Sequence, residues 1–211
     1  IGLALDLNHH SQPSVVVENG RVYASHGMEN LDSDSRGRIV CFDANGSGDI
    51  TKTNEIWRYD AIGVGYASPL IHDGRLYVIT NAGNLKALDA ATGKEFWTFN
   101  VGTVGKGSPV WADGKIFATA VNGHFHIIKP GDKAAKSLDS KQIAFDETRA
   151  AEIYGSPAIA YQRIYLQPKS GCFAWATRTR RSKPRHRRSS SCRSQRVHRA
   201  PRPFTSKLSQ R

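Results

Sequence analysis

Short apolar segments separated by turns recur along most of the chain. Each of four copies contains a proline, an apolar segment, a two-residue turn and a second apolar segment. The turns are Asn19-Gly20, Asp73-Gly74, Asp113-Gly114 and Tyr161-Gln162. Asn-Gly and Asp-Gly between apolar runs favour type I′ hairpins, in which both turn residues have positive φ. Each copy therefore predicts an antiparallel β-hairpin.

A glycine and a third apolar segment follow each hairpin. Gly83, Gly123 and Gly171 come nine residues after the second turn residue, whereas Gly37 is delayed by an insertion of eight residues. A fourth segment with a tryptophan, Trp57 or Trp97, ends the first two copies. The predicted strands are 14–18, 21–25, 38–43, 55–59, 69–72, 75–80, 84–89, 95–99, 109–111, 115–120 and 124–129.

The spacing of the copies indicates the fold class. Their prolines lie 56, 40 and 48 residues apart, and no segment has a helical period. Four short strands in about 40 residues, repeated, are typical of a β-propeller blade. We therefore predict an all-β protein with an incomplete β-propeller over residues 1–176, made of about three four-stranded antiparallel blades and part of a fourth.

Two stretches resemble a known repeat. Residues 68–78 and the segment 88–97, which reads Leu-Asp-Ala-Ala-Thr-Gly-Lys-Glu-Phe-Trp, are similar to the repeat of bacterial pyrroloquinoline-quinone (PQQ)-like propellers. That group includes quinoprotein alcohol dehydrogenases and the propeller lipoprotein of outer-membrane protein assembly. The resemblance covers about residues 11–175. It implies a periplasmic or secreted protein in which blade-closing tryptophans dock between neighbouring blades on a Thr-Gly turn, with Trp57, Asp89, Thr92, Gly93 and Trp97 as the structural docking residues.

Composition separates the repeats from the end of the chain. The formal net charge is +12, but residues 177–211 hold 13 Lys and Arg and no Asp or Glu. This leaves 17 basic and 18 acidic residues in residues 1–176, a net charge of −1. Residues 177–211 have too few apolar side chains to form a core, so we expect a disordered tail. It is either a polyanion-binding tail, for nucleic acid or anionic lipid, or the product of a shifted reading frame.

The fourth copy stops at residues 171–176, and no Thr-Gly turn or docking tryptophan follows, so we expect the chain to be a fragment of a longer propeller. Missing blades would leave apolar residues such as Ile71, Leu76, Val78, Val110 and Ile116 covered on fewer sides. Exposed apolar faces promote association. We therefore expect the isolated chain to aggregate.

Residues at equivalent positions give a candidate binding site. His10, Tyr66, Lys106 and Tyr154 each lie two positions before the Ser or Gln that precedes the repeat proline. The first strand of a propeller blade lines the central channel, so these side chains would ring its mouth. They could bind a small ligand or a protein partner there, or they could be solvent-facing turn residues.

The sequence gives weak signals for cofactors. A PQQ-dependent dehydrogenase would need a quinone, Ca²⁺ and a catalytic carboxylate, and its family often has adjacent cysteines; Cys41, Cys172 and Cys192 are far apart. Residues 43–54 resemble a calcium loop, but Asn54 replaces the expected acidic ligand. His9-His10 and His124-x-His126 have no evident third metal ligand. We therefore assign no cofactor, metal or catalytic residue and predict no membrane span. The expected function is a non-catalytic scaffold or binding module; the alternatives are part of a PQQ-dependent dehydrogenase and polyanion binding through the tail.

Overall fold

The structure is a computed structural model that describes residues 3–4, 13–144, 149–169 and 173–176. These residues all belong to one compact unit, residues 1–177, and none of them is helical. His9, His10, Gly171, Cys172, Cys192 and the basic tail lie outside the described residues.

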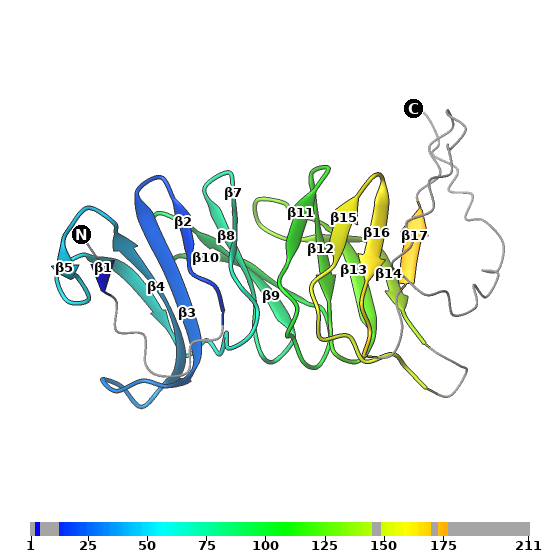
Figure 1. Cartoon of the computed structure of the whole chain (residues 1–211), viewed down its shortest axis with the longest axis horizontal. Helices are drawn as coiled ribbons and strands as arrows, with labels where there is room; N and C mark the ends of the chain where they lie inside the picture. The colour runs from blue at the N-terminus through cyan, green and yellow to red at the C-terminus, as the bar shows by residue number, and fades with distance from the viewer. Residues whose placement is uncertain (1–2, 5–12, 145–148, 170–172, 177–211) are drawn as a thin grey trace, which may run out of the picture. The chain divides into compact units, whose positions relative to one another are not determined.

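Strands of the described residues form successive antiparallel sheets that follow one another in chain order (Figure 1). The first blade contains β2 (Val16–Glu18), β3 (Arg21–Glu29), β4 (Arg36–Asp43) and β6 (Glu55–Asp60). The second contains β7 (Leu70–His72), β8 (Arg75–Ile79), β9 (Asn84–Asp89) and β10 (Glu95–Asn100). The third contains β11 (Val110–Ala112), β12 (Lys115–Thr119), β13 (His124–Lys129) and β14 (Lys136–Gln142). The fourth has three strands, β15 (Ala158–Ala160), β16 (Arg163–Leu166) and β17 (Phe173–Ala176).

The predicted fold class and strands are confirmed, with shifts of a few residues at the ends. The insertion before Gly37 lengthens β3 and β4 into a longer hairpin. The sequence did not predict β14, which is mostly exposed and polar. It also missed a short parallel pair, β1 (Leu3–Ala4) with β5 (Gly48–Asp49), because two-residue strands have no detectable period.

Backbone conformation explains the turn and glycine positions. Both turn residues have positive φ in all four hairpins, including 51° for Tyr161 and 60° for Gln162, as type I′ geometry requires. Gly83 also has positive φ, and a Cβ there would lie 2.3 Å from the Gly102 carbonyl oxygen. Gly37 has the same relationship to the Ile62 carbonyl oxygen. A glycine at this position therefore lets the loop to the next blade pack against the start of the third strand.

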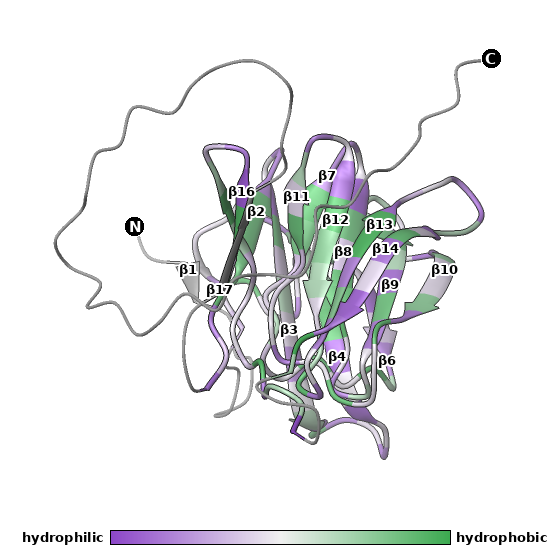
Figure 2. Cartoon of the chain, turned by 90° about the vertical axis from the view of Figure 1, so that its right-hand side faces the viewer, coloured by the Kyte–Doolittle hydropathy of each residue, from purple (hydrophilic) through white to green (hydrophobic). Residues whose placement is uncertain are grey.

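The core lies between the blades. Successive residues of a strand point to opposite faces of its sheet. In β8, Leu76 and Val78 accordingly pack with residues of the first blade, while Tyr77 and Ile79 pack with residues of the third. Figure 2 shows apolar stretches along β8, β12 and β13.

This arrangement corrects one sequence-based expectation. Leu76, Val78 and Ile116 are fully buried rather than partly uncovered, because a neighbouring blade covers each of them. Ile71 and Val110 are half-buried. On the other face of the first blade, Ile50 from the loop after β4 packs with Val22, Ala24, Val40 and Phe42. That loop thus covers the apolar face of the first blade that has no neighbouring blade, a face that we expected to be exposed to solvent.

Candidate binding surface at the blade loops

Tryptophan residues hold neighbouring blades together. Trp57 in β6 is 8% exposed, and its indole N–H donates to the Ala90 carbonyl oxygen of the second blade at 3.1 Å. Trp97 in β10 is 5% exposed and donates to the Gly131 carbonyl oxygen of the third blade at 2.9 Å. Both side chains cross a seam between blades, as the resemblance implies. We expect both to be structural.

The Thr-Gly turn contacts the tryptophan of the preceding blade. Asp89 caps this turn, because its Oδ1 accepts hydrogen bonds from the backbone N–H groups of Ala91 and Thr92. Gly93 lies against the Trp57 ring. The sequence pattern matched this turn to Trp97, which follows it in the same blade. The structure instead pairs the turn with Trp57 and pairs Trp97 with Gly131.

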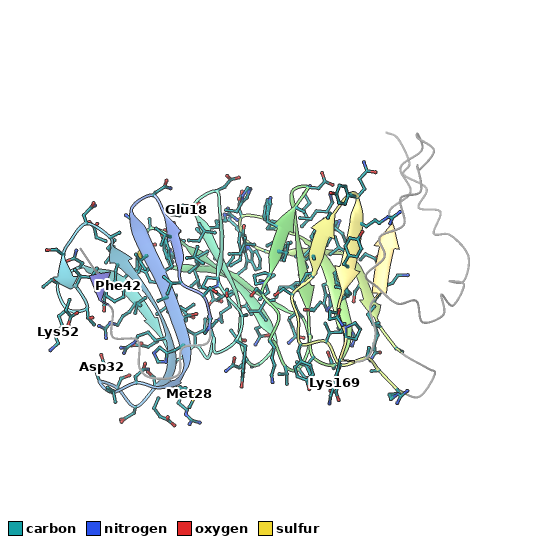
Figure 3. All side chains as sticks on the ribbon, viewed as in Figure 1. Glu18, Met28, Asp32, Phe42, Lys52 and Lys169 are labelled. Atoms are coloured by element: carbon teal, nitrogen blue, oxygen red, sulfur yellow. The ribbon has the colours of Figure 1, made fainter. Side chains whose placement is uncertain are left out.

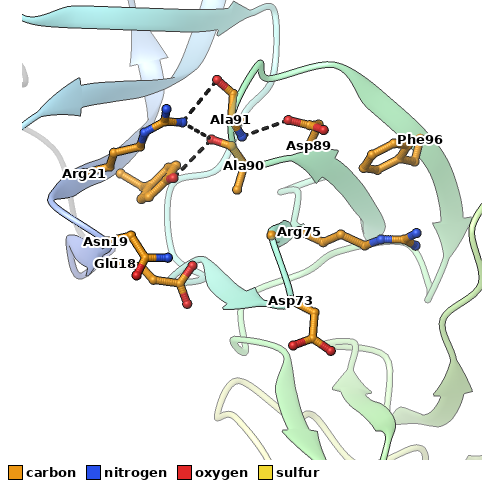
Figure 4. A pocket seen from close by; sticks show the side chains of 11 residues that line it. Glu18, Asn19, Arg21, Asp73, Arg75, Asp89, Ala90, Ala91 and Phe96 are labelled. Atoms are coloured by element: carbon orange, nitrogen blue, oxygen red, sulfur yellow. Dashed lines mark hydrogen bonds between the residues drawn. The ribbon is translucent and has the colours of Figure 1, made fainter.

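Arginines after the first two hairpin turns add a second contact across the first two seams. Arg21 donates to the carbonyl oxygens of Ala90 and Ala91 at 3.5 and 3.3 Å, in the wall of a cleft of about 570 Å³ (Figure 4). Arg75 donates to the Gly131 carbonyl oxygen at 2.6 Å, and its guanidinium lies over the Phe96 ring. The sequence shows a basic residue after each turn, but it does not show that Arg21 and Arg75 donate hydrogen bonds to the neighbouring blade. Several of the groups that line this cleft therefore join neighbouring blades.

Serines beside the repeat prolines form a hydrogen-bond ladder at the start of the blades. Ser14, which follows Pro13, donates its N–H to the hydroxyl oxygen of Ser68 at 2.9 Å. The N–H of Ser68 donates to the hydroxyl oxygen of Ser108, and the N–H of Ser108 donates to that of Ser156, each at 2.8 Å. Their first strands are also neighbours, since β7 contacts both β2 and β11. The ladder fixes the relative heights of the loops that precede these strands.

Three of the four predicted mouth residues come together on this frame. The Lys106 ammonium lies 4.6 Å from the centre of the Tyr66 ring and 4.9 Å from the centre of the Tyr154 ring. Each residue comes from a different inter-blade loop. Tyr66 and Tyr154 are 46% and 41% exposed, and Lys106 is half-buried. We call these three residues the Tyr-Lys-Tyr stack; His10, the fourth predicted member, lies outside the described residues.

Neighbouring groups hold the stack in place. Tyr154 donates its hydroxyl hydrogen to Glu152 at 3.0 Å, and this bond raises the pKa of Tyr154. Lys169 donates to the same carboxylate oxygen at 3.3 Å. The Gly65 N–H donates to the Asn81 side-chain oxygen at 3.0 Å next to Tyr66. The stack therefore presents two aromatic rings and one ammonium from fixed loops.

The stack lies at the end of the sheets opposite the hairpin turns. Its residues precede the first strands, whereas the turns follow them. Figure 3 shows Glu18, beside the first turn, at one end of the sheets and Lys169, which contacts Glu152, at the other.

Several candidate metal ligands in the described part of the chain form hydrogen bonds with protein groups. No group of three or more His, Cys, Asp and Glu side chains in that part could hold a metal ion. In the loop 43–54, Asp43 and Asp49 accept hydrogen bonds from residues two positions ahead, as in Asx turns. His126 is held by the Val101 carbonyl oxygen at 2.9 Å, and its burial lowers its pKa.

The sequence and the fold match known proteins. A family model described as outer membrane protein assembly factor BamB matches residues 35–171. A search of curated proteins gives no match. No helix in the described ranges is long and apolar enough to cross a membrane.

Solved structures share the fold at low sequence identity. BamB from Moraxella catarrhalis is 18% identical with a TM-score of 0.58, over 78% of this chain and 46% of that chain. Quinohemoprotein alcohol dehydrogenase from Comamonas testosteroni is 19% identical with a TM-score of 0.56, over 79% of this chain and 30% of that chain. The computationally designed Ika4 protein is 11% identical with a TM-score of 0.60, over 82% of this chain and 96% of that chain. This chain thus spans less than half the length of the BamB chain.

Proposed function

Because the chain belongs to the protein family described as outer membrane protein assembly factor BamB, we propose that it is a non-catalytic scaffold that binds polypeptide partners through the Tyr-Lys-Tyr stack. The fold is shared with BamB and with quinoprotein dehydrogenases, so fold alone does not distinguish a binding role from a redox role. The distinction depends on the residues at the site.

The stack is the observation that supports a binding role. Three inter-blade loops place two exposed tyrosine rings next to one ammonium group. Tyrosine is enriched at protein interfaces, because a rigid ring buries a large area at a small cost in conformational entropy. The described neighbours, Glu152 and Lys169, bond to the stack or to each other and form no nucleophile and base pair.

The family description also suggests where in the cell the protein functions. The family description names an assembly factor for outer membrane proteins. A chain that binds polypeptides in that process would function outside the cytoplasm, and we propose an extracytoplasmic location for this protein.

Selection from a random dodecapeptide library displayed on phage would test the binding role. Peptides enriched on the 211-residue chain should bind the Tyr66→Ala/Tyr154→Ala double variant at least about tenfold more weakly, because aromatic hot-spot residues each contribute about 1–2 kcal/mol or more. Tyr161→Ala is the matched control, because this tyrosine is 93% exposed and lies in a turn at the opposite end of the sheets. Enriched peptides that bind all three proteins equally would contradict a role for the stack.

A quinone titration would test the redox alternative. PQQ with excess Ca²⁺ would be added while the intrinsic tryptophan fluorescence is measured. Our proposal predicts no saturable quenching. Saturable quenching that the Tyr66→Ala/Tyr154→Ala variant loses would instead support part of a quinone-dependent dehydrogenase.

A further inference from the structure

Lys106 differs from other half-buried lysines of the described blades in its charge partner. Lys86 lies 2.7 Å from Glu95, and Lys115 lies 2.5 Å from Asp113. Within the described ranges, Lys106 forms no salt bridge. Its ammonium is instead flanked by the Tyr66 and Tyr154 rings.

The surrounding described groups leave the charge of this ammonium uncompensated. Glu152 accepts hydrogen bonds from Tyr154 and Lys169, and these bonds lower its pKa, so it stays ionised while bound to them. An aromatic ring attracts a cation through its quadrupole, which is a weaker interaction than a hydrogen-bonded ion pair in a partly desolvated site. The two rings contact the Lys106 ammonium without supplying a negative charge.

We propose that Lys106 receives an acidic side chain of the bound polypeptide, so that the Tyr-Lys-Tyr stack selects segments with Asp or Glu. This inference rests on the proposed function, because it assumes that the stack is the binding surface. One carboxylate neutralises one ammonium, and the flanking rings contact the methylene groups of the same side chain and its neighbours. A phosphate dianion would call for a second cation, and Lys169 is already bound to Glu152.

Two fluorescein-labelled dodecapeptides provide the probe. One alternates Glu with Ser, and the other has Gln in place of every Glu. Fluorescence anisotropy with the 211-residue chain should show at least about tenfold tighter binding of the Glu peptide, the range expected for a charge-assisted hydrogen bond. Lys106→Gln should remove this preference, and Lys106→Arg should retain most of it.

Lys115→Gln is the matched control. It removes the same charge from the same blade at the opposite end of the sheet, where Lys115 pairs with Asp113. The preference for the Glu peptide should be unchanged in this variant. Equal thermal unfolding midpoints of the two Gln variants would show that folding does not explain the difference.

Several results would overturn the inference. A Glu preference that survives in Lys106→Gln, or that Lys115→Gln also removes, would show nonspecific charge attraction. Tighter binding of a phosphoserine peptide that depends on Lys106 would identify a phosphate site. Displacement of the Glu peptide by an equal concentration of free glutamate would identify a small-molecule site.

The test also separates this inference from the proposed function. If both peptides bind equally and the Tyr66→Ala/Tyr154→Ala variant weakens both, the stack is a binding surface without a preference for acidic segments. If neither peptide binds the wild-type chain, the acidic preference is wrong, and the phage selection decides the binding role independently.

Discussion

The Trp57 ring occupies the space that a side chain at position 93 would need, because a Cβ at Gly93 would lie 2.5 Å from Cε3 of Trp57. Gly93 also has a φ of +73°, a region that disfavours residues with a side chain. Two independent costs therefore act against any substitution there.

Gly93→Ala should destabilise the blades by more than about 2 kcal/mol, since it adds a steric conflict at the seam to the backbone strain. Gly74→Ala is the control: its φ is +70°, but a Cβ at this position would have nothing within 4 Å, so only the strain of about 1 kcal/mol applies. Urea unfolding followed by tryptophan fluorescence would measure both. Equal effects would show that the Trp57 ring moves aside without cost.

Trp97→Ala should destabilise the chain by about 3–5 kcal/mol, because it removes a buried ring and the hydrogen bond to Gly131 across the second seam. Trp111→Ala should cost clearly less. Trp111 is half-buried in the middle of β11, the first strand of the third blade, and its ring stacks on that of His72 with 3.9 Å between the ring centres. Differential scanning calorimetry of both variants would compare them, and a larger effect of Trp111→Ala would contradict the assigned role of Trp97.

Ser108→Ala should destabilise the chain by about 1 kcal/mol, because it leaves the part-buried N–H of Ser68 without its acceptor. Ser156→Ala should cost less, since the N–H of Ser108 that loses its acceptor is exposed and water can replace it. Chemical denaturation measures the difference. The serine ladder would be unimportant for stability if Ser108→Ala had no effect.

Acid should weaken the seam between the first two blades. Partial burial raises the pKa of Glu95, but hydrogen bonds from Lys86, Thr98 and Tyr59 outweigh it and lower the pKa to about 2. This is below the value of 4.5 for a free Glu, so the stabilisation is present above about pH 4.5 and is lost as the pH falls towards 2.

Glu95→Gln should remove this part of the pH dependence, about 1 kcal/mol after solvent screening. Unfolding free energies at pH 7 and pH 3 would measure it. Asp34→Asn, at an exposed position, is the control for removal of a carboxylate. A wild-type difference between the two pH values that Glu95→Gln leaves intact would assign the acid sensitivity to other groups.

Turn and glycine chemistry explains why the blades could be predicted from the sequence. The paired positive φ values at Asp73-Gly74 require residues that tolerate this conformation. The close approach of Gly83 to the Gly102 carbonyl oxygen requires glycine. The same residue types therefore recur at a regular spacing in the sequence. Strand β14 left no such pattern, because its exposed residues Lys136–Gln142 have no apolar alternation and no tryptophan. The pairing of the Thr-Gly turn with Trp57 was also missed, since motifs along the chain do not show which blade supplies each partner.

The candidate site was only partly predictable. Equivalent positions in the repeat suggested that Tyr66, Lys106 and Tyr154 share a surface. The sequence could not show that the Lys106 ammonium lies within 5 Å of both ring centres, because this depends on how far each of three separate loops extends. The serine that precedes the last three repeat prolines was a visible signal for the ladder that sets those positions, but a hydrogen bond between blades cannot be inferred from one copy.

The seam contacts have a direction along the chain that matters while the chain emerges and folds. Trp57 donates to Ala90, and Trp97 donates to Gly131, so each blade is completed by a residue about 30 positions further on. A chain that emerges from a channel with its N-terminus first would present a finished sheet with an unpaired tryptophan until the next blade follows. We therefore expect folding to advance one blade behind the emerging chain, and the blade that emerged last to be the one most exposed to chaperones and proteases at each moment.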